Sequence, residues 1–416
     1  MSEESSVPAS RDPSVTTSEF DGMQRVLGGR MPQLDALRAL AILAVILHNA
    51  GARGLENPAG VLVKLVEFAA TTGWVGVQLF FVLSGFLITG ILVDGRGDPH
   101  QLRNFYMRRV LRIFPLYYAF LFIVFVLLPL LGMMPTWLEK SYAHQFWYWS
   151  YLINWAEPFL GPVELGHIWS LAVEEQFYIL WPMLVIAIRR RALAYVCLGL
   201  ILSAIVTRIL LIQHDPEFAS KAAYMFTIAR WDSLALGALL ALALRDEVWY
   251  ERLRVWVPRL ALPLAAAVLL QTALVREFTA ATGAFGFLNQ TTSALLFGAL
   301  IFASIVPDMP GTRMLQNGLL NPALRLIGKY SYAIYVVHIP MKYIWFSTLG
   351  LLPVRPDAWQ QIGVIAYNFL GVSILSTAVA FVSWHVLERP FLNLKRYFIN
   401  RAQPAHAASS HSGMQG

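Results

Sequence analysis

The stretch LDALRALAILAVILHNAG, residues 34–51, decides the fold class of this chain. As a helix it is long and apolar enough to cross the roughly 30 Å hydrocarbon core of a bilayer, yet it carries Arg38 and His48. Ionisable groups at membrane depth are costly unless they are paired or face a wet cavity. The stretch therefore predicts a membrane-spanning helix that borders a polar chamber.

Apolar runs of this kind continue almost to the end of the chain. Of the 416 residues, 57% are hydrophobic and only 14% are charged, which excludes an ordinary soluble domain and indicates a polytopic membrane protein. We predict an all-α transmembrane helical bundle of about ten spans. The expected spans are residues 34–50, 74–94, 110–132, 167–188, 193–213, 224–244, 258–275, 284–306, 328–350 and 361–386.

The distribution of Lys and Arg sets the expected orientation of the bundle. If the N-terminus is cytoplasmic, most basic residues, including Arg108, Arg109 and Arg112, fall in or beside cytoplasmic segments. The positive-inside rule then places both termini in the cytoplasm. Anchoring to lipid headgroups explains the formal net charge of +7, so we expect the lipid bilayer, and no nucleic acid, as a partner.

One membrane domain lies between two polar ends. Residues 1–33 are rich in Ser, Thr and Pro and are predicted to be a disordered cytoplasmic tail. Residues 34–390 are the predicted membrane domain, and residues 391–416 are a predicted cytoplasmic C-terminal tail. Cys197 lies in an apolar run and is expected to be a small buried residue. We expect no metal site.

A polar stripe is predicted along the fourth span, GHIWSLAVEEQFYILWP, residues 166–182. At about 100° per residue, His167, Ser170, Glu174 and Tyr178 fall on one helix face. Glu175 lies about 100° further round and is expected to meet another neighbour, such as Arg230. The stripe is either functional or a hydrogen-bonding seam that joins membrane helices.

His48 follows Arg38 by ten residues, which is about 15 Å along a helix axis. One helix therefore places side chains at two depths of the membrane, with Arg38 near the cytoplasmic end and His48 toward the outer half. A neutral imidazole at that depth can accept a proton from a hydroxyl. A satisfied packing histidine is the alternative. His338 shares a predicted face with Tyr335 in the ninth span and fits a structural or a functional role equally.

The sequence RNFYMRRVLRIFPLYY, residues 103–118, places Arg108, Arg109 and Arg112 at the mouth of the third span. Guanidinium groups bind phosphates in a bidentate manner, so an anionic cofactor fits, as does anchoring to lipid headgroups. Small residues elsewhere, such as Ser84, Gly85 and those around Gly237, predict close approach of helices rather than catalysis.

Seven ordered stretches carry a resemblance to a known family. They are LDALRALAILAVILH, LFFVLSGFL, RRVLRIFPLYY, HIWSLAVEEQFYILWP, RWDSLALGALLA, GKYSYAIYVVHIP and LERPF. The chain resembles the acyltransferase-3 membrane proteins, which acylate cell-surface sugars and some secondary metabolites. The match covers most of the predicted membrane domain.

The resemblance implies a ten-helix fold that takes an acyl group from cytoplasmic acyl-coenzyme A, with Arg38 and His48 matching the family's essential pair. We therefore expect an integral O-acyltransferase of the inner membrane that acylates a hydroxyl of a cell-surface or lipid-linked glycan. It is expected to use acetyl-coenzyme A as donor substrate and to hold no tightly bound cofactor. A proton-coupled transporter or flippase is the alternative, because chains of His and Glu inside bundles also relay protons. No internal repeat of the kind common in transporters is visible.

The expected roles follow from this scheme. Arg108, Arg109 and Arg112 would hold the phosphates of coenzyme A, and Arg38 would steady the pantetheine or thioester end. His48 would act as general base, or carry the acyl group transiently. Glu174 with His167 would orient the imidazole or the acceptor. The further residues expected to bind substrate are Ser170, Tyr178, Glu175, Arg230 and His338.

Overall fold

The computed structural model describes residues 13–51, 60–214, 216–274, 286–348 and 358–398. These residues form helices and connecting turns, without any strand among them, so the predicted all-α class is confirmed. Within this part of the chain, nine helical segments are long and apolar enough to cross a membrane by length and composition. The polytopic membrane character is therefore confirmed at the level of helix length and hydropathy.

The long helices overlap the predicted spans, with ends that differ by up to about ten residues. They are α2 (Pro32–Ile46), α4 (Val75–Asp94), α5 (Gln101–Phe122), α10 (Trp169–Ala187), α11 (Arg190–His214), α13 (Thr227–Ala243), α14 (Glu247–Leu274), α15 (Gly286–Ile305), α17 (Pro322–Thr348) and α18 (Ala358–Ser383). Of these, α17 covers the ninth predicted span but is not among the nine candidates. Its Tyr, His and Lys side chains lower its hydropathy, and the count of ten spans stays a prediction.

The remaining helical segments precede, connect or follow these ten helices. They are α1 (Pro13–Gly28), η1 (Leu47–Gly51), α3 (Gly60–Thr72), η2 (Ile123–Leu127), α6 (Leu128–Leu130), η3 (Thr136–Leu138), α7 (Glu139–Ala143), α8 (Phe146–Trp149), α9 (Ile153–Leu160), η4 (Gly166–Ile168), α12 (Pro216–Met225), α16 (Arg313–Leu319), η5 (Trp384–Glu388), α19 (Arg389–Asn393) and η6 (Leu394–Tyr397). The last two fall in the region predicted as a C-terminal tail, whose residues 399–416 lie outside the described part.

Helix α1 departs from the disordered tail predicted for residues 1–33. Met23 is fully buried and Leu27 is nearly so, while the side-chain amide of Gln24 donates to the carbonyl of Leu244 at 2.9 Å. Glu19 forms an ion pair with Arg254 of α14. Although the segment is polar in composition, Met23 and Leu27 are spaced by one helical turn and form a short apolar face that packs on the bundle. Residues 1–12 lie outside the described part.

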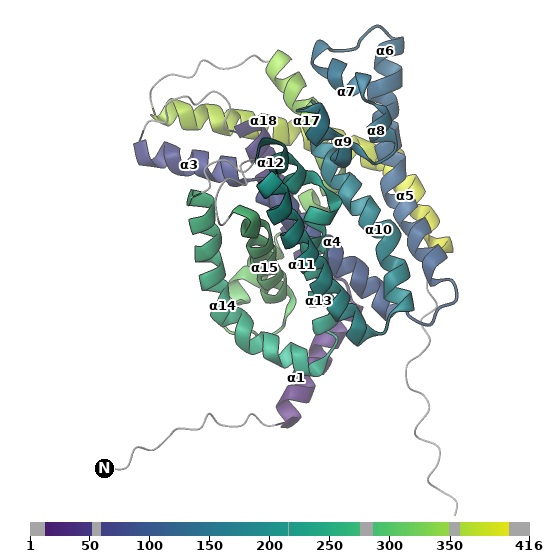
Figure 1. Cartoon of the computed structure of the whole chain (residues 1–416), viewed down its shortest axis with the longest axis vertical. Coiled ribbons are helices and arrows are strands. Elements are labelled where there is room, and N and C mark those ends of the chain that lie inside the picture. Colours follow the sequence, from purple (N-terminus) through teal and green to yellow (C-terminus); the bar gives the residue numbers. More distant parts are fainter. Residues whose placement is uncertain (1–12, 52–59, 215, 275–285, 349–357, 399–416) are drawn as a thin grey trace, which may run out of the picture.

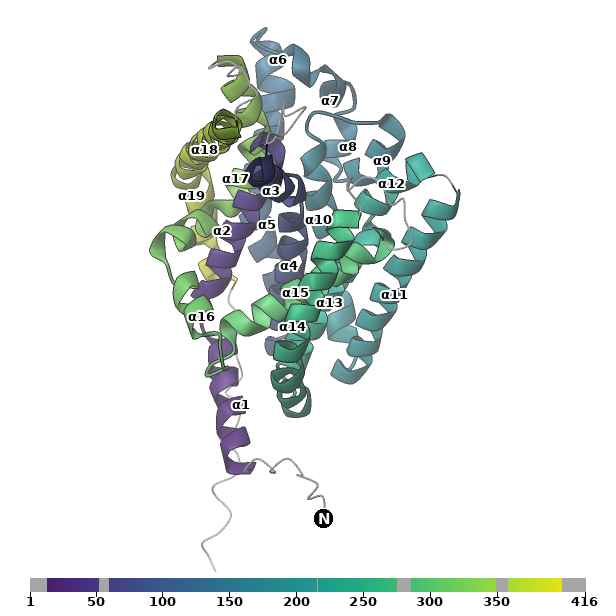
Figure 2. The same cartoon turned by 90° about the vertical axis from the view of Figure 1, so that its left-hand side faces the viewer.

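The bundle is built around α4, which contacts α2, α10, α13 and α15 and lies inside it in Figures 1 and 2. Gly85 of α4 rests against the backbone of Leu234, and Gly237 of α13 rests against the backbone of Val82. A β-carbon at either glycine would clash with the opposite helix. The predicted close approach at these small residues is therefore confirmed.

One end of α2 is covered by two helices that run across the others. In Figure 2, α2 leads from α1 at the bottom of the view to α3 at the top. There α3 and α18 are seen nearly end-on, whereas both lie horizontally in Figure 1. Each of them contacts η1, the segment that continues α2 and carries His48. The crosswise helices thus hold His48 at one end of the bundle.

Candidate active site

In the described part of the bundle, two cavities are lined by predicted site residues. The first, of about 470 Å³, is lined by His48 and His167 and is called here the histidine cavity. The second, of about 330 Å³, is lined by Arg38 and several further cations and is called the arginine cavity. Val77 and Tyr335 line both, so these two side chains belong to the wall at which the cavities meet.

The arginine cavity gathers positive charge from three segments of the chain. Its cations are Arg38 of α2, Arg108, Arg109 and Arg112 of α5, and Lys395 of η6. Arg38 is braced by an ion pair with Asp35 at 3.0 Å, and the guanidinium of Arg109 lies 5.1 Å from the ring centroid of Tyr178. Five converging cations make this cavity suited to an anion that carries several phosphate groups.

Both carboxylates of the fourth span line the arginine cavity as well. Glu174 accepts a hydrogen bond from the hydroxyl of Ser84 at 2.9 Å, and the hydroxyl of Tyr178 lies 3.1 Å from its other oxygen. Glu175 has a wall position beside it. The predicted separation of the two side chains is therefore wrong, because 100° on a helix still leaves both on the side that faces one wide cavity.

Arg230 does not pair with Glu175, contrary to the predicted contact. Its guanidinium is fully buried and lies 5.0 to 5.4 Å from the ring centroids of Phe81, Trp169 and Tyr224. The nearby carboxylate of Asp232 is bound by Arg208 at 2.9 Å instead. Arg230 lines neither cavity, but Trp169 and Tyr224 separate it from the histidine cavity and Phe81 borders the arginine cavity.

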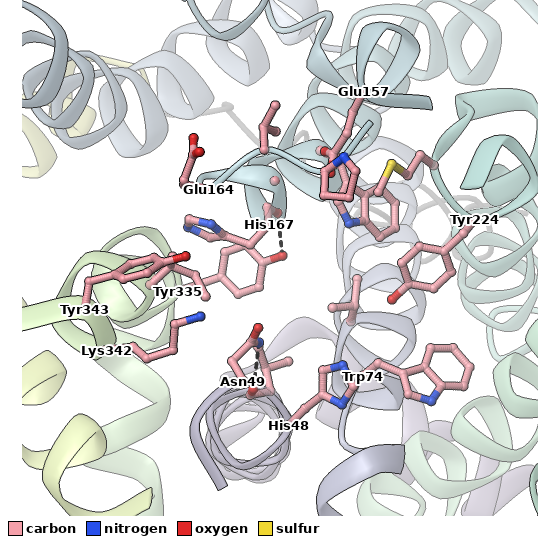
Figure 3. Close-up of a pocket in the computed structure, with 18 residues that line it drawn as sticks. His48, Asn49, Trp74, Glu157, Glu164, His167, Tyr224, Tyr335, Lys342 and Tyr343 are labelled. Carbon is pink, nitrogen blue, oxygen red and sulfur yellow. Dashed lines mark hydrogen bonds between the residues drawn. The ribbon is translucent and has the colours of Figure 1, made fainter. Parts of the chain in front are cut away.

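The histidine cavity is assembled from several helix ends (Figure 3). His48 and Asn49 come from η1, His167 from η4, and Lys342 from α17. The His48 Nδ1 lies 3.1 Å from the carbonyl oxygen of Ala70. A carbonyl only accepts, so Nδ1 carries the proton and the lone pair of the neutral ring is on Nε2. His48 is an exposed side chain on the wall of this cavity, which suits a proton acceptor.

The backbone around His48 departs from a regular α-helix. Residues Leu47–Gly51 are π-helical, and single π turns in helices are frequent at functional sites. The side-chain amide of Asn49 donates to the carbonyl of Val45 at 2.9 Å, one turn back. Gly73 lies so close that an added β-carbon would meet the carbonyl of Ala44 and the β-carbon of His48. Only glycine allows the chain to pass here.

His167 lies apart from the rest of the predicted stripe. Ser170, Glu174 and Tyr178 line the arginine cavity, whereas His167 lines the histidine cavity. The cause is local: His167 belongs to the 3₁₀ turn η4, where the rotation per residue is larger than in the α-helix used for the count. Its Nε2 lies 3.2 Å from the carbonyl oxygen of Val336.

His338 is fully buried and lines neither cavity. Its Nδ1 lies 2.7 Å from the carbonyl oxygen of Tyr335, one turn back in α17, and its ring centroid is 4.9 Å from that of His167. The hydroxyl of Tyr335 donates to the carbonyl of His167 at 2.8 Å. Within the described structure His338 therefore supports η4 rather than reaching across a cavity.

Four charged residues of the cavities were not predicted from the sequence, and Glu164, in the loop before η4, is one of them. Lys342 follows His338 by four residues and so repeats its helix face, a signal that could have been read. Lys395 follows LERPF in a basic stretch that was assigned to the tail. Glu157 lies in INWAEPFL, residues 153–160, where no helical period points to it. Only the packing of α9 over η4 brings Glu157 to the cavity.

Comparison with known proteins places these cavities in context. The family profile described as an acyltransferase domain, acyltransferase-3, matches residues 31–385. The chain is 29% identical to "Peptidoglycan O-acetyltransferase OatA" of Listeria monocytogenes, over 92% of this chain and 61% of the relative. It is also 29% identical to "Putative peptidoglycan O-acetyltransferase YrhL" of Bacillus subtilis, over 92% of this chain and 59% of the relative.

A putative O-acetyltransferase of Staphylococcus aureus is 27% identical over 87% of this chain and 57% of the relative. The chain thus spans about three fifths of the length of these curated relatives. No solved structure matches it. Because the family profile covers the chain from the start of α2 into η5, and so includes both cavity histidines and every cavity arginine, the chain belongs to the acyltransferase-3 family.

Proposed function

We propose that this protein transfers an acetyl group from cytoplasmic acetyl-coenzyme A to a hydroxyl of a cell-surface glycan of the peptidoglycan type. The acyltransferase family supports the reaction class, and the names of the relatives support the acyl group and the acceptor. The proposal includes ten spans, with both termini in the cytoplasm of a cell whose inner membrane holds the protein, as the distribution of Lys and Arg favours.

The arginine cavity is the proposed donor site. Arg108 and Arg109 lie on one turn of α5 and Arg112 on the next, and Lys395 adds a cation from η6. These groups would hold the phosphates of coenzyme A, while Arg38 would steady the thioester end. The donor is a substrate that leaves after each turnover, so no tightly bound cofactor is required.

The histidine cavity is the proposed acceptor site. Because Nδ1 of His48 donates a hydrogen bond to the carbonyl oxygen of Ala70, the lone pair on Nε2 is available to accept a proton. As general base it would take the proton of the acceptor hydroxyl as that oxygen attacks the acyl carbonyl, and the coenzyme A thiolate leaves. Transient acylation of His48 is the other route. His167, on the opposite wall, would orient the acceptor (Figure 3).

One observation carries this proposal: Arg38 and His48, ten residues apart on one continuous helical segment, line two different cavities that meet at Val77 and Tyr335. The acyl group would cross at this wall. Glu174, Ser170 and Tyr178 lie on the donor side of it, and the hydroxyls of Ser170 and Tyr335 are 2.6 Å apart. Glu175 would contact the donor, whereas Arg230 and His338 would support the wall from behind.

The direct test is release of coenzyme A from acetyl-coenzyme A by the full chain in detergent, with glycan strands from peptidoglycan as acceptor. Release should depend on the glycan and should fall at least a hundredfold in His48→Ala, in keeping with the usual contribution of a general base. His385→Ala, an exposed histidine of η5, should behave as wild type. If no coenzyme A is released either with or without glycan, a transport function would be favoured instead.

A further inference from the structure

Glu157 is the most buried carboxyl group of the histidine cavity and has no role in the scheme above. It comes from α9, is 6% exposed, and lines the cavity together with His167 and His48. Figure 3 shows its carboxyl group directed from α9 toward the cavity, on the side of His167 and opposite His48. One of its oxygens, Oε2, is buried without a hydrogen-bond partner in the described structure. A buried unpartnered oxygen costs free energy unless something else satisfies it.

The backbone makes room for this carboxyl group. A β-carbon added to Gly166, the residue before His167, would lie 2.6 Å from Oε1 of Glu157. Any other residue there would push the carboxyl group aside. Gly166 thus keeps Glu157 against the turn that carries His167, and the two side chains share one wall of the cavity.

The charge state of Glu157 follows from its surroundings. Burial raises the pKa of Glu157 to about 8, and the backbone N–H of Val163 with the charges of Lys140 and Lys221 only partly opposes this. Tyr148 is a further titratable neighbour. The other charged or titratable groups that line the cavity are His48, Glu164, His167, Tyr224, Tyr335, Lys342 and Tyr343. Near neutral pH Glu157 is therefore a carboxylic acid, with one O–H donor and free acceptor capacity.

Building on the proposed function, we infer that Glu157 binds the acceptor, and that the acceptor unit in this cavity is an amino-sugar ring held through two neighbouring polar groups, a hydroxyl and an acetamido group. A carboxylic acid donates one hydrogen bond and accepts another, which matches such a pair, because a hydroxyl and an amide each can donate and accept. The aromatic residues Trp74, Trp169 and Tyr224 line the same cavity, and aromatic side chains pack well against ring carbons.

Glu164 provides a matched comparison in the same cavity. Its Oε2 accepts hydrogen bonds from the backbone N–H of Ser141 at 2.9 Å and from the Ser141 hydroxyl at 2.7 Å. This carboxylate is thus engaged in holding α7 to the loop before η4. Glu157 has a free oxygen for a ligand, whereas Glu164 has a partner within the protein.

The experiment measures binding of soluble glycan strands from peptidoglycan to the full chain in detergent by calorimetry, without acetyl-coenzyme A. Wild-type affinity should fall about tenfold between pH 6.5 and pH 9, because about one tenth of Glu157 remains protonated at pH 9. Glu157→Gln, which cannot ionise, should remove most of this pH dependence. Glu157→Ala should weaken binding about tenfold or more at pH 6.5, and Glu164→Gln should keep the wild-type ratio between the two pH values.

Three results would overturn the inference: a Glu157→Gln variant that keeps the wild-type pH ratio, wild-type protein that binds no glycan at pH 6.5, or normal binding by Glu157→Ala. Glycan binding with the expected pH dependence in a protein that releases no coenzyme A would leave this inference standing while the proposed transfer reaction fails. The melting temperature of each variant shows whether it is folded.

Discussion

At the scale of single residues, the two cavities differ in how their charges are compensated. Arg38 is braced by Asp35, and Glu174 by Ser84 and Tyr178, so these groups keep their geometry without substrate. Glu157 has one unpartnered oxygen, so substrate would complete its hydrogen bonding. The arginine cavity, the proposed donor site, is thus preorganised, whereas the histidine cavity, the proposed acceptor site, has an unsatisfied oxygen whose hydrogen bonding a ligand would complete.

The raised pKa of Glu157 also has a consequence for stability. The folded protein holds the proton up to about pH 8, whereas the ordinary value is 4.5. Between these values the folded state binds more protons than the unfolded state, so Glu157 lowers stability as pH rises through this window and has no further effect above it. The melting temperature of Glu157→Gln relative to wild type should therefore increase from pH 5 to pH 8 and then level off. A difference that is constant across this range would contradict the assignment.

At the level of the helices, α5 contributes Arg108, Arg109 and Arg112 to the arginine cavity. Arg103 lies on the same helix but does not line this cavity. Replacing Arg108 and Arg112 together by Gln should raise KM for acetyl-coenzyme A about tenfold or more and leave kcat nearly unchanged, because a phosphate contact remote from the reacting carbonyl acts on the ground and transition states alike. Steady-state kinetics would check this, with Arg103→Gln as the control. A fall in kcat at constant KM would contradict a phosphate-binding role.

Helix positions were predictable from the sequence because hydropathy and length are properties of continuous stretches. The exceptions depend on local backbone or on distant contacts. His167 does not belong to the predicted stripe because η4 is a 3₁₀ turn. Helix α1 forms in a polar segment because Met23 and Leu27 are buried against the bundle. Glu157 joins the cavity only through the packing of α9, which no periodicity in its own sequence encodes.

For the whole molecule, the proposed function means that the acyl group enters at the arginine cavity and leaves at the histidine cavity, on opposite sides of the membrane. The chain should then transfer acetyl groups only between compartments. Apart from Lys395, the residues that line the two cavities lie within the part matched by the family profile, and the full chain can be tested in sealed vesicles.

The most direct measurement uses such vesicles with radiolabelled acetyl-coenzyme A either trapped inside or supplied outside, and with glycan strands outside in both cases. We expect labelled glycan when the donor is inside, whatever the mixture of protein orientations, and none when donor and glycan are both outside. His48→Ala vesicles should give no label in either arrangement. Equal labelling from outside donor would contradict transfer across the membrane and, with it, the assignment of the two cavities to opposite sides.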